Sequence, residues 1–131
     1  MNIPDTYADL IGAPHFGHLA TVNQDGTPQS TPIWLLREGD DLLFSTRDDR
    51  RKAANIRRNP AVSISILDQK DPYRYVELRG TAEITHAGNY ELVDRLAKAY
   101  LGKDAYPWKT AEDMPHRVVV RMRVQHVSTQ G

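Results

Sequence analysis

The chain has 131 residues, and its 17 Lys and Arg side chains balance 17 Asp and Glu side chains, so the formal net charge is zero. A neutral chain lacks the broad electrostatic attraction on which nucleic-acid-binding and membrane-surface proteins depend, and the absence of cysteine excludes disulfides and thiolate chemistry. With 40% hydrophobic and 26% charged residues, the composition is that of a compact globular protein, and the length predicts a single domain over residues 1–131.

The first residues carry no targeting or membrane signal. The segment MNIPDTYADLIGAP has no basic flank and no long apolar run. No later stretch approaches the roughly 20 apolar residues of a membrane span. We therefore expect a cytoplasmic protein without membrane contact, whose residues 5–11 form a short helix ended by Gly12 and Pro14.

The next part of the chain predicts an antiparallel meander followed by a helix. Turns with the compositions Asp-Gly and Glu-Gly-Asp separate three short stretches of strand-forming residues, namely 19–22, 29–36 and 42–45. Residues 48–58 predict the first long helix, with Thr46 or Asp48 as its N-cap and with Pro60 preventing its continuation.

The second half of the chain predicts more strands and a second helix. Period-two alternation of β-branched and aromatic side chains predicts strands over residues 61–68 and 73–85. An amphipathic helix that covers a sheet is expected over residues 88–100, from the helical spacing of Leu92, Val93, Leu96, Ala99 and Tyr100. An irregular segment then leads to a last strand over residues 117–128.

Together these elements predict a mainly β fold. About six strands with only two long helices favour a six-stranded antiparallel barrel with a few flanking helices, because a parallel sheet needs a crossover helix after nearly every strand. Side chains fill the interior of such a small barrel. A ligand is therefore expected on the outside of the barrel or at a seam between two subunits.

The stretch STRDDRRKAANIRRNP concentrates positive charge on this neutral background. Residues 47–58 hold six basic and two acidic side chains, a local charge of plus four. Two hydroxyls, on Ser45 and Thr46, precede two cations, Arg50 and Lys52, near the helix N-terminus, where amide N–H groups and the helix dipole attract anions. The pattern indicates a phosphate site, and the alternative is an exposed helix whose charges only maintain solubility.

Single-stranded nucleic acid is a second candidate ligand for this region. Tyr73, Tyr75 and Trp108 beside the basic residues would give a stacking platform on a small barrel. The zero net charge argues against this ligand, because phosphate contacts by Lys and Arg supply most of its affinity.

The sequence contains no recognisable catalytic constellation. Its five histidines are scattered, and no HExxH or comparable ligand spacing occurs, so no metal site is expected. The glycine-rich dinucleotide and phosphate-loop motifs and the serine-hydrolase elbow are also missing, which leaves the catalytic residues unknown. If the protein is an enzyme, its reactive atom belongs to a bound cofactor.

Three stretches of the sequence carry a family resemblance. LATVNQDGTPQSTPIWLL, LLFSTRDDRRKAANIRRNPAVSISI and YVELRGTAEI resemble the FMN-binding split-barrel superfamily related to pyridoxamine 5'-phosphate oxidase. Within it, the chain is most similar to the flavin/deazaflavin oxidoreductases of the B group, which mostly use the deazaflavin coenzyme F420 rather than FMN. The resemblance implies that the R-x-K pattern of Arg50 and Lys52 holds the phosphate of the cofactor tail.

The same resemblance implies a larger set of cofactor-binding residues. They are Gln29, Ser30, Thr31, Pro32 and Trp34 beneath the tricyclic ring, Ser45, Thr46, Arg50 and Lys52 at the phosphate, and Tyr73, Tyr75 and Trp108 in the surrounding groove. The family pairs two subunits around the cofactor, which implies a homodimer whose partner chain supplies Tyr73 and Tyr75. Cross-strand packing is the alternative for these tyrosines, and core or dimer burial is the alternative for the tryptophans.

Some features depart from the family pattern or leave the reaction open. Pro32 stands where some deazaflavin users have a polar side chain, and no residue matches a dedicated proton donor. Arg117, Arg121 and Arg123 alternate along the last predicted strand, where they either meet the polyglutamate tail of F420 or face solvent.

The leading hypothesis from the sequence is an oxidoreductase that transfers a hydride from reduced F420 to a planar, electron-poor organic acceptor. One alternative is an FMN-binding oxidase or reductase of the pyridoxamine-phosphate-oxidase type. Another is a non-catalytic protein that binds or sequesters F420. A single-stranded nucleic-acid-binding protein comes last.

Overall fold

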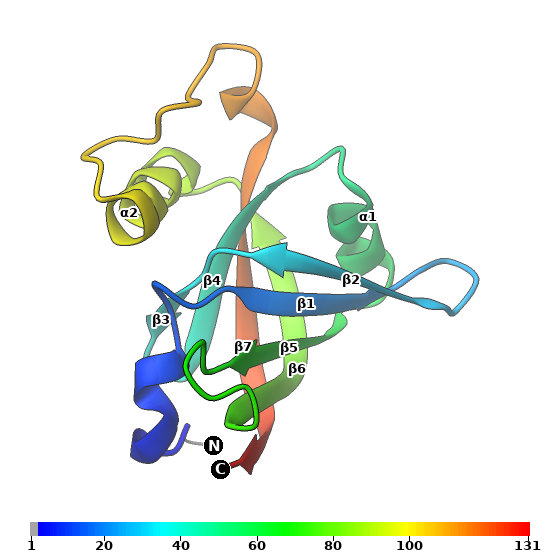
Figure 1. Ribbon diagram of the computed structural model, residues 1–131. Helices are drawn as coiled ribbons and strands as arrows, with labels where there is room; N and C mark the ends of the chain where they lie inside the picture. The colour runs from blue at the N-terminus through cyan, green and yellow to red at the C-terminus, as the bar shows by residue number, and fades with distance from the viewer. Residues whose placement is uncertain (1–2) are drawn as a thin grey trace.

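The computed structural model describes residues 3–131, which form one curled antiparallel sheet with helices around it (Figure 1). The seven strands follow the order β2-β1-β5-β6-β7-β4-β3. In chain order the elements are the 3₁₀ helix η1 (Asp5–Leu10), β1 (Gly17–Val22), β2 (Pro28–Ile33), β3 (Leu36–Glu38), β4 (Asp41–Arg47), α1 (Arg51–Arg58), β5 (Ala61–Leu67), β6 (Tyr75–Thr85), α2 (Asn89–Leu101), the 3₁₀ helix η2 (Met114–His116) and β7 (Arg117–Gln130). The predicted mainly β, antiparallel fold is confirmed.

A short crossing between the two edge strands curls the sheet into a barrel. β2 and β3 stand at opposite ends of the strand order, yet only Trp34 and Leu35 separate them in the chain. At about 3.6 Å per residue, this link spans about 11 Å from Ile33 to Leu36, so the two edges of the sheet must lie close together. Leu35 is fully buried at the crossing, which anchors it in the core.

The prediction of a single strand over residues 29–36 is wrong, because this stretch contributes to two strands, β2 and β3. β2 pairs with β1, whereas β3 pairs with β4 on the other side of the barrel. A continuous strand could not serve both partners, so the chain breaks at the crossing between them. This break raises the number of strands from the expected six to seven.

The predicted N-caps of α1 are also wrong. Arg50 occupies the N-cap position, and no side chain caps the helix. Thr46 lies within β4, and the N–H of Asp48 donates to the carbonyl of His116 at 2.8 Å, which holds the chain outside the helix at that point. None of the helices that the structure describes in residues 3–131 is long and apolar enough to cross a membrane.

Apolar side chains from all the long strands fill the interior of the barrel. The largest of those that are fully buried include Leu19, Leu42, Phe44, Ile64, Ile66, Val76, Leu78 and Met122. On β5 the burial alternates with a period of two, which gives the strand one inward and one outward face. A filled interior leaves the outside of the barrel for a ligand, as the sequence predicted.

The outward faces of β4 and β7 carry a second apolar cluster, which is covered by α2. Leu43 of β4 and Val119 of β7 pack there against Leu92 and Leu96 of the helix. The helix therefore covers the sheet as expected from the sequence, although the alanine on its buried face is Ala97 and the predicted Ala99 is exposed. Because side chains alternate along a strand, Ser45 lies on the same outward face of β4 as Leu43.

A β-bulge bends the two longest strands where they pair. The register of β6 against β7 shifts between Arg79 and Gly80, so that Gly80 faces Val124 and leaves Gln125 as the extra residue. A Cβ atom built on Gly80 would overlap the carbonyl oxygen of Arg123. Glycine is therefore required here by the close approach of the two backbones.

We expect Gly80→Ala to lower the free energy of unfolding by about 2–4 kcal/mol, because the added methyl group must displace backbone rather than a flexible side chain. Urea unfolding followed by circular dichroism measures the change. Ser128→Ala, at an exposed position of the same β6–β7 ladder, is the matched control and should cost less than about 0.5 kcal/mol. Equal stability of the two variants would contradict the account.

Candidate functional site

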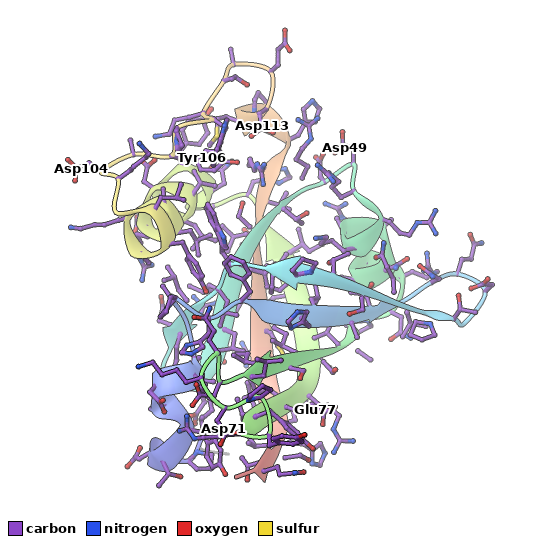
Figure 2. The ribbon with its side chains drawn as sticks, in the orientation of Figure 1. Asp49, Asp71, Glu77, Asp104, Tyr106 and Asp113 are labelled. Carbon is purple, nitrogen blue, oxygen red and sulfur yellow. The ribbon has the colours of Figure 1, made fainter. Side chains whose placement is uncertain are left out.

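A pocket of about 410 Å³ opens on the outside of the barrel, beside α2 and the N-terminal turn of α1. Its volume lies within the roughly 300–1,000 Å³ of small-molecule sites. The lining residues are Phe16, Pro32, Ile33, Trp34, Ser45, Thr46, Arg47, Arg50, Lys52, Val93, Leu96, Tyr106, Trp108 and Arg117. In Figure 2, Tyr106 lies at the same end of the molecule as Asp49 and Asp113.

One half of the pocket is an apolar wall assembled from separate parts of the chain. Its members are Phe16 just before β1, Pro32 and Ile33 of β2, Trp34 of the crossing, Val93 and Leu96 of α2, and Trp108 of the segment before η2. Phe16 and Trp108 are 49% and 57% exposed, so two aromatic rings of the wall are open to solvent. A flat apolar ligand would cover them.

The other half of the pocket is basic. Arg47, Arg50, Lys52 and Arg117 all line it. Two carboxylates balance the charges of Arg47 and Arg117: Arg47 pairs with Asp49 and Asp113, each at 2.9 Å, and Arg117 pairs with Asp113 at 2.8 Å. Within residues 3–131, neither Arg50 nor Lys52 has a carboxylate partner at ion-pair distance. This end of the pocket therefore holds two positive charges that an anion would compensate.

This arrangement destabilises the charged form of Lys52. Burial, followed by the nearby charges of Arg50 and Arg117, lowers the pKa of the Lys52 ammonium below its ordinary value of 10.5. Each of these causes disfavours the charged form. A bound anion would oppose them and raise the pKa again, so binding of an anion and protonation of Lys52 favour each other.

Ser45 adds an unused hydrogen-bonding group to the pocket. Its hydroxyl oxygen is buried and has no hydrogen-bond partner in the structure of residues 3–131. A buried polar atom without a partner costs free energy, and most such atoms in folded proteins are paired. Because Ser45 lines the pocket, a ligand oxygen can supply the missing partner.

The carboxylate of Asp113 fixes the position of two arginines in the pocket wall. Arg47 Nη1 and Arg117 Nε donate to its two oxygens. Although burial raises the pKa of Asp113, the hydrogen bonds from Arg117 and Arg47 outweigh it and hold that pKa below its ordinary value. Arg47 also binds Asp49 and lowers the pKa of that carboxyl to about 2. These charges stay ionised at neutral pH and keep the wall in place.

The segment between α2 and η2 is tied down next to the aromatic wall. The two carboxylate oxygens of Asp94 on α2 accept from the N–H of Tyr106 at 2.8 Å and from Lys109 Nζ at 2.7 Å. The Tyr106 hydroxyl accepts from Arg117 Nη2 at 3.1 Å, and its ring meets Trp108 edge to face. A segment predicted as irregular is therefore held from both sides of the pocket.

The structure brings together most of the residues selected from the sequence, but not all of them. Those that line the one pocket are Pro32, Trp34, Ser45, Thr46, Arg50, Lys52 and Trp108. Gln29, Ser30 and Thr31 precede them on β2 and lie outside the lining. Whether any of these residues binds a cofactor stays a prediction.

Tyr73 and Tyr75 lie at the opposite end of the molecule. They belong to the β5–β6 loop and the start of β6, which Figure 1 places near the two termini, and Figure 2 places the neighbouring Asp71 far from Tyr106. Tyr73 is 80% exposed. Within one chain these tyrosines cannot reach the pocket, and they do not form a continuous stacking platform with Trp108.

Sequence reasoning missed several residues of the pocket. Phe16 and Tyr106 gave no signal, because neither lies in a motif or in a periodic element. Arg47 was counted in the basic stretch without a role, although its position two residues after Ser45 places both on one face of β4. Arg117 lines the pocket, whereas Arg121 is engaged by Glu38 and Asp41.

Comparison with known proteins identifies the family. The profile of the family described as pyridoxamine 5'-phosphate oxidase matches residues 3–131. The chain belongs to this family. The resemblance carried by the three sequence stretches is therefore confirmed.

Similar proteins cover almost the whole chain. A solved structure named F420 reductase is 38% identical with a TM-score of 0.85, over 96% of this chain and 98% of that one. A conserved hypothetical protein from Mycobacterium tuberculosis is 26% identical with a TM-score of 0.78, over 98% and 84%. General stress protein 26 of Bacillus subtilis (strain 168) is 27% identical over 128 residues, which are 96% of this chain and 86% of that protein.

We expect Lys52→Met to have opposite effects on stability and on anion binding. Because the pKa of Lys52 is lower in the folded protein than its ordinary value, the unfolded chain holds this proton more tightly, and the charged side chain lowers stability at neutral pH. The variant should therefore unfold at a higher temperature than the parent, and the difference should shrink as the pH rises toward 10.5. Its affinity for inorganic phosphate should fall about tenfold.

Thermal unfolding at several pH values and calorimetric titration with phosphate measure the two effects. Lys103→Met removes the same charge at an exposed position just after α2 and should change neither property. A lower unfolding temperature for Lys52→Met at neutral pH would overturn the assignment of Lys52 as an uncompensated charge.

Proposed function

We propose that this protein binds the deazaflavin coenzyme F420 and transfers a hydride from its reduced form to a planar, electron-poor organic acceptor. The observation that carries the proposal is the division of one pocket into an aromatic wall and a basic end, where two cations have no ion-pair partner among residues 3–131. A cofactor with a flat ring and a phosphate-bearing tail has the same division. The 38% identity to a protein named F420 reductase supports this choice of cofactor.

The basic end has the groups that a phosphate requires. Arg50 and Lys52 supply charge, and the buried hydroxyl of Ser45 supplies a hydrogen bond that no residue from 3 to 131 satisfies. Thr46 follows on the same strand and lines the same end. Charge-assisted hydrogen bonds are among the strongest in proteins, so these groups would hold the tail and thereby fix the ring.

The edge of β2 supports the placement of the ring. Along an antiparallel strand, the N–H groups of successive residues point alternately toward the neighbouring strand and away from it. Pro28 and Pro32 have no N–H, so they fit the positions whose nitrogen points away from β1. Ser30 lies two residues from each proline, so its N–H also points away from β1, to the free edge of the sheet. A ring beneath which β2 runs would receive this amide at its polar rim, with Trp34 at the end of the strand.

For hydride transfer, the protein needs only to bind the cofactor and to orient it. Reduced F420, when bound, supplies the hydride. The aromatic wall orients the ring and excludes water from one of its faces, and the phosphate contacts prevent it from sliding. No protein nucleophile is required, and no catalytic residue is assigned. A solvent proton completes the reduction of the acceptor.

The proposal includes a homodimer. Two aromatic rings of the wall are open to solvent, and the pocket is an open cleft on the surface of one chain. Tyr73 is exposed at the far end of the molecule, where it is available to a second copy. A partner chain that brings Tyr73 and Tyr75 over the pocket would cover the exposed face of the ring.

FMN is the second candidate cofactor, because the family profile is that of pyridoxamine 5'-phosphate oxidase. An FMN-binding oxidase or reductase would use the same pocket. A protein that binds F420 without turning over an acceptor is a further alternative within the same site. Separate titrations of the apo protein with F420 and with FMN, at fixed ionic strength, distinguish the cofactors. Tighter binding of FMN, or binding of neither, would overturn the F420 proposal.

We expect the double variant Arg50→Ala, Lys52→Ala to bind F420 at least about tenfold more weakly, since each charge-assisted contact contributes on the order of 1.5–3 kcal/mol. Quenching of tryptophan fluorescence during the titration measures the affinity. The matched control is Arg51→Ala, Arg57→Ala, which removes the same charge from α1 at exposed positions outside this pocket. Equal losses in the two variants would show that only the overall charge matters.

A further inference from the structure

Tyr100 lies directly behind the aromatic wall without lining the pocket. It belongs to the last turn of α2, and its ring stacks on Trp34 at a centroid distance of 5.3 Å and an interplanar angle of 8°. On another side it meets Phe16 at 5.7 Å. Trp34 and Phe16 both line the pocket, whereas Tyr100 does not. One side chain of α2 therefore supports two aromatic rings that face the ligand.

The hydroxyl of Tyr100 joins two segments that are far apart in the sequence. It donates to the carbonyl of His15 at 2.6 Å and accepts from the N–H of Leu35 at 3.1 Å. His15 immediately precedes Phe16, and Leu35 immediately follows Trp34. Each of the two wall residues is therefore next to a backbone group that Tyr100 holds, so the hydroxyl fixes the backbone and the ring fixes the side chains.

Both hydrogen bonds are hard to replace. Leu35 is fully buried, so its N–H has no access to solvent if the phenol oxygen is removed. Burial raises the pKa of Tyr100, with a smaller opposing effect from the hydrogen bond to Leu35, and the phenol therefore keeps its proton and its donor at neutral pH. Helical spacing in the sequence identified Tyr100 only as part of the buried face of α2, which does not explain a hydroxyl there.

We infer that Tyr100 is a positioning residue for the ring of the bound cofactor, acting through Trp34 and Phe16. The inference rests on the proposed function, because it concerns the ring half of the same pocket. It predicts different effects on ligand binding at the two halves of that pocket. The phosphate end is built from Ser45, Arg50 and Lys52. Tyr100 packs against the outer apolar cluster that includes Leu43 of β4, but its hydroxyl bonds only to the backbone of His15 and Leu35 among residues 3–131. Loss of the hydroxyl should therefore weaken ring binding and leave phosphate binding unchanged.

The test uses two probes that each fill one half of the pocket. Deazariboflavin, which has the ring and the ribityl chain but no phosphate, reports on the aromatic wall, and inorganic phosphate reports on the basic end. Tyr100→Phe keeps the aromatic ring and removes both hydrogen bonds, whereas Tyr100→Leu also removes the stack on Trp34. Tyr90→Phe is the matched control, because Tyr90 lies on the same helix and is 50% exposed.

We expect Tyr100→Phe to bind deazariboflavin about fivefold more weakly and Tyr100→Leu more weakly still, from the usual worth of one to two hydrogen bonds. Phosphate affinity should change by less than about twofold in both variants, and Tyr90→Phe should match the parent. Near-ultraviolet circular dichroism of the folded variants should show a changed tryptophan signal for Tyr100→Leu. This readout requires no turnover and no loaded enzyme.

The outcomes separate the inference from the proposed function. Equal loss of affinity for both probes would mean that Tyr100 acts through general stability, and unchanged affinity for both would remove its role; either result overturns the inference and leaves the proposed function standing. If the parent protein binds phosphate but neither deazariboflavin nor riboflavin, the proposed function fails, and the inference fails with it.

Discussion

The period-two alternation of β4 and β7 is the constraint on which the rest of the structure depends. One face of each strand fills the barrel, and the other face is left to be covered from outside. On that outer face Leu43 and Val119 seat α2, while Ser45 and Arg117 line the pocket. The core, the helix and the candidate site are thus fixed by the same two strands, and a slip of one residue in their pairing would invert all three.

The electrostatics of the pocket follow from the position of this outer face. Asp49 and Asp113 together balance the charges of Arg47 and Arg117, and Asp113 binds both arginines and fixes them in the wall. Arg50 and Lys52 have no carboxylate partner within residues 3–131. The lowered pKa of Lys52 shows that burial and the neighbouring arginines disfavour its charged form. A protein that used these cations only for solubility would leave Lys52 fully in water. Their placement in a pocket is better explained by an anionic ligand.

The parts of this molecule that could be predicted from its sequence are those written in local patterns. A few neighbouring residues are enough to predict an alternating strand, the amphipathic helix α2 or the basic stretch from Ser45 to Lys52. The break after Ile33 could not be predicted, because it depends on which strand pairs with which and not on the residues at the break. Phe16 and Tyr106 were missed for the same reason, since only the folded chain brings them to the pocket.

This difference between local and long-range assembly has a consequence for the cofactor. The phosphate end comes from one continuous stretch of chain, so it forms whenever β4 and α1 form. The aromatic wall needs Phe16, Trp34, Trp108 and α2 to meet, and Tyr100 ties two of these parts together. Both F420 and FMN carry their phosphate on the chain attached to a flat ring system, so under the proposed function the basic end suits either cofactor. The two differ in the ring that the aromatic wall would hold and in the polyglutamate tail that F420 carries beyond its phosphate. The aromatic wall is the part of the pocket whose shape depends on distant residues, so it is the part where small changes elsewhere in the chain would alter the choice of ring.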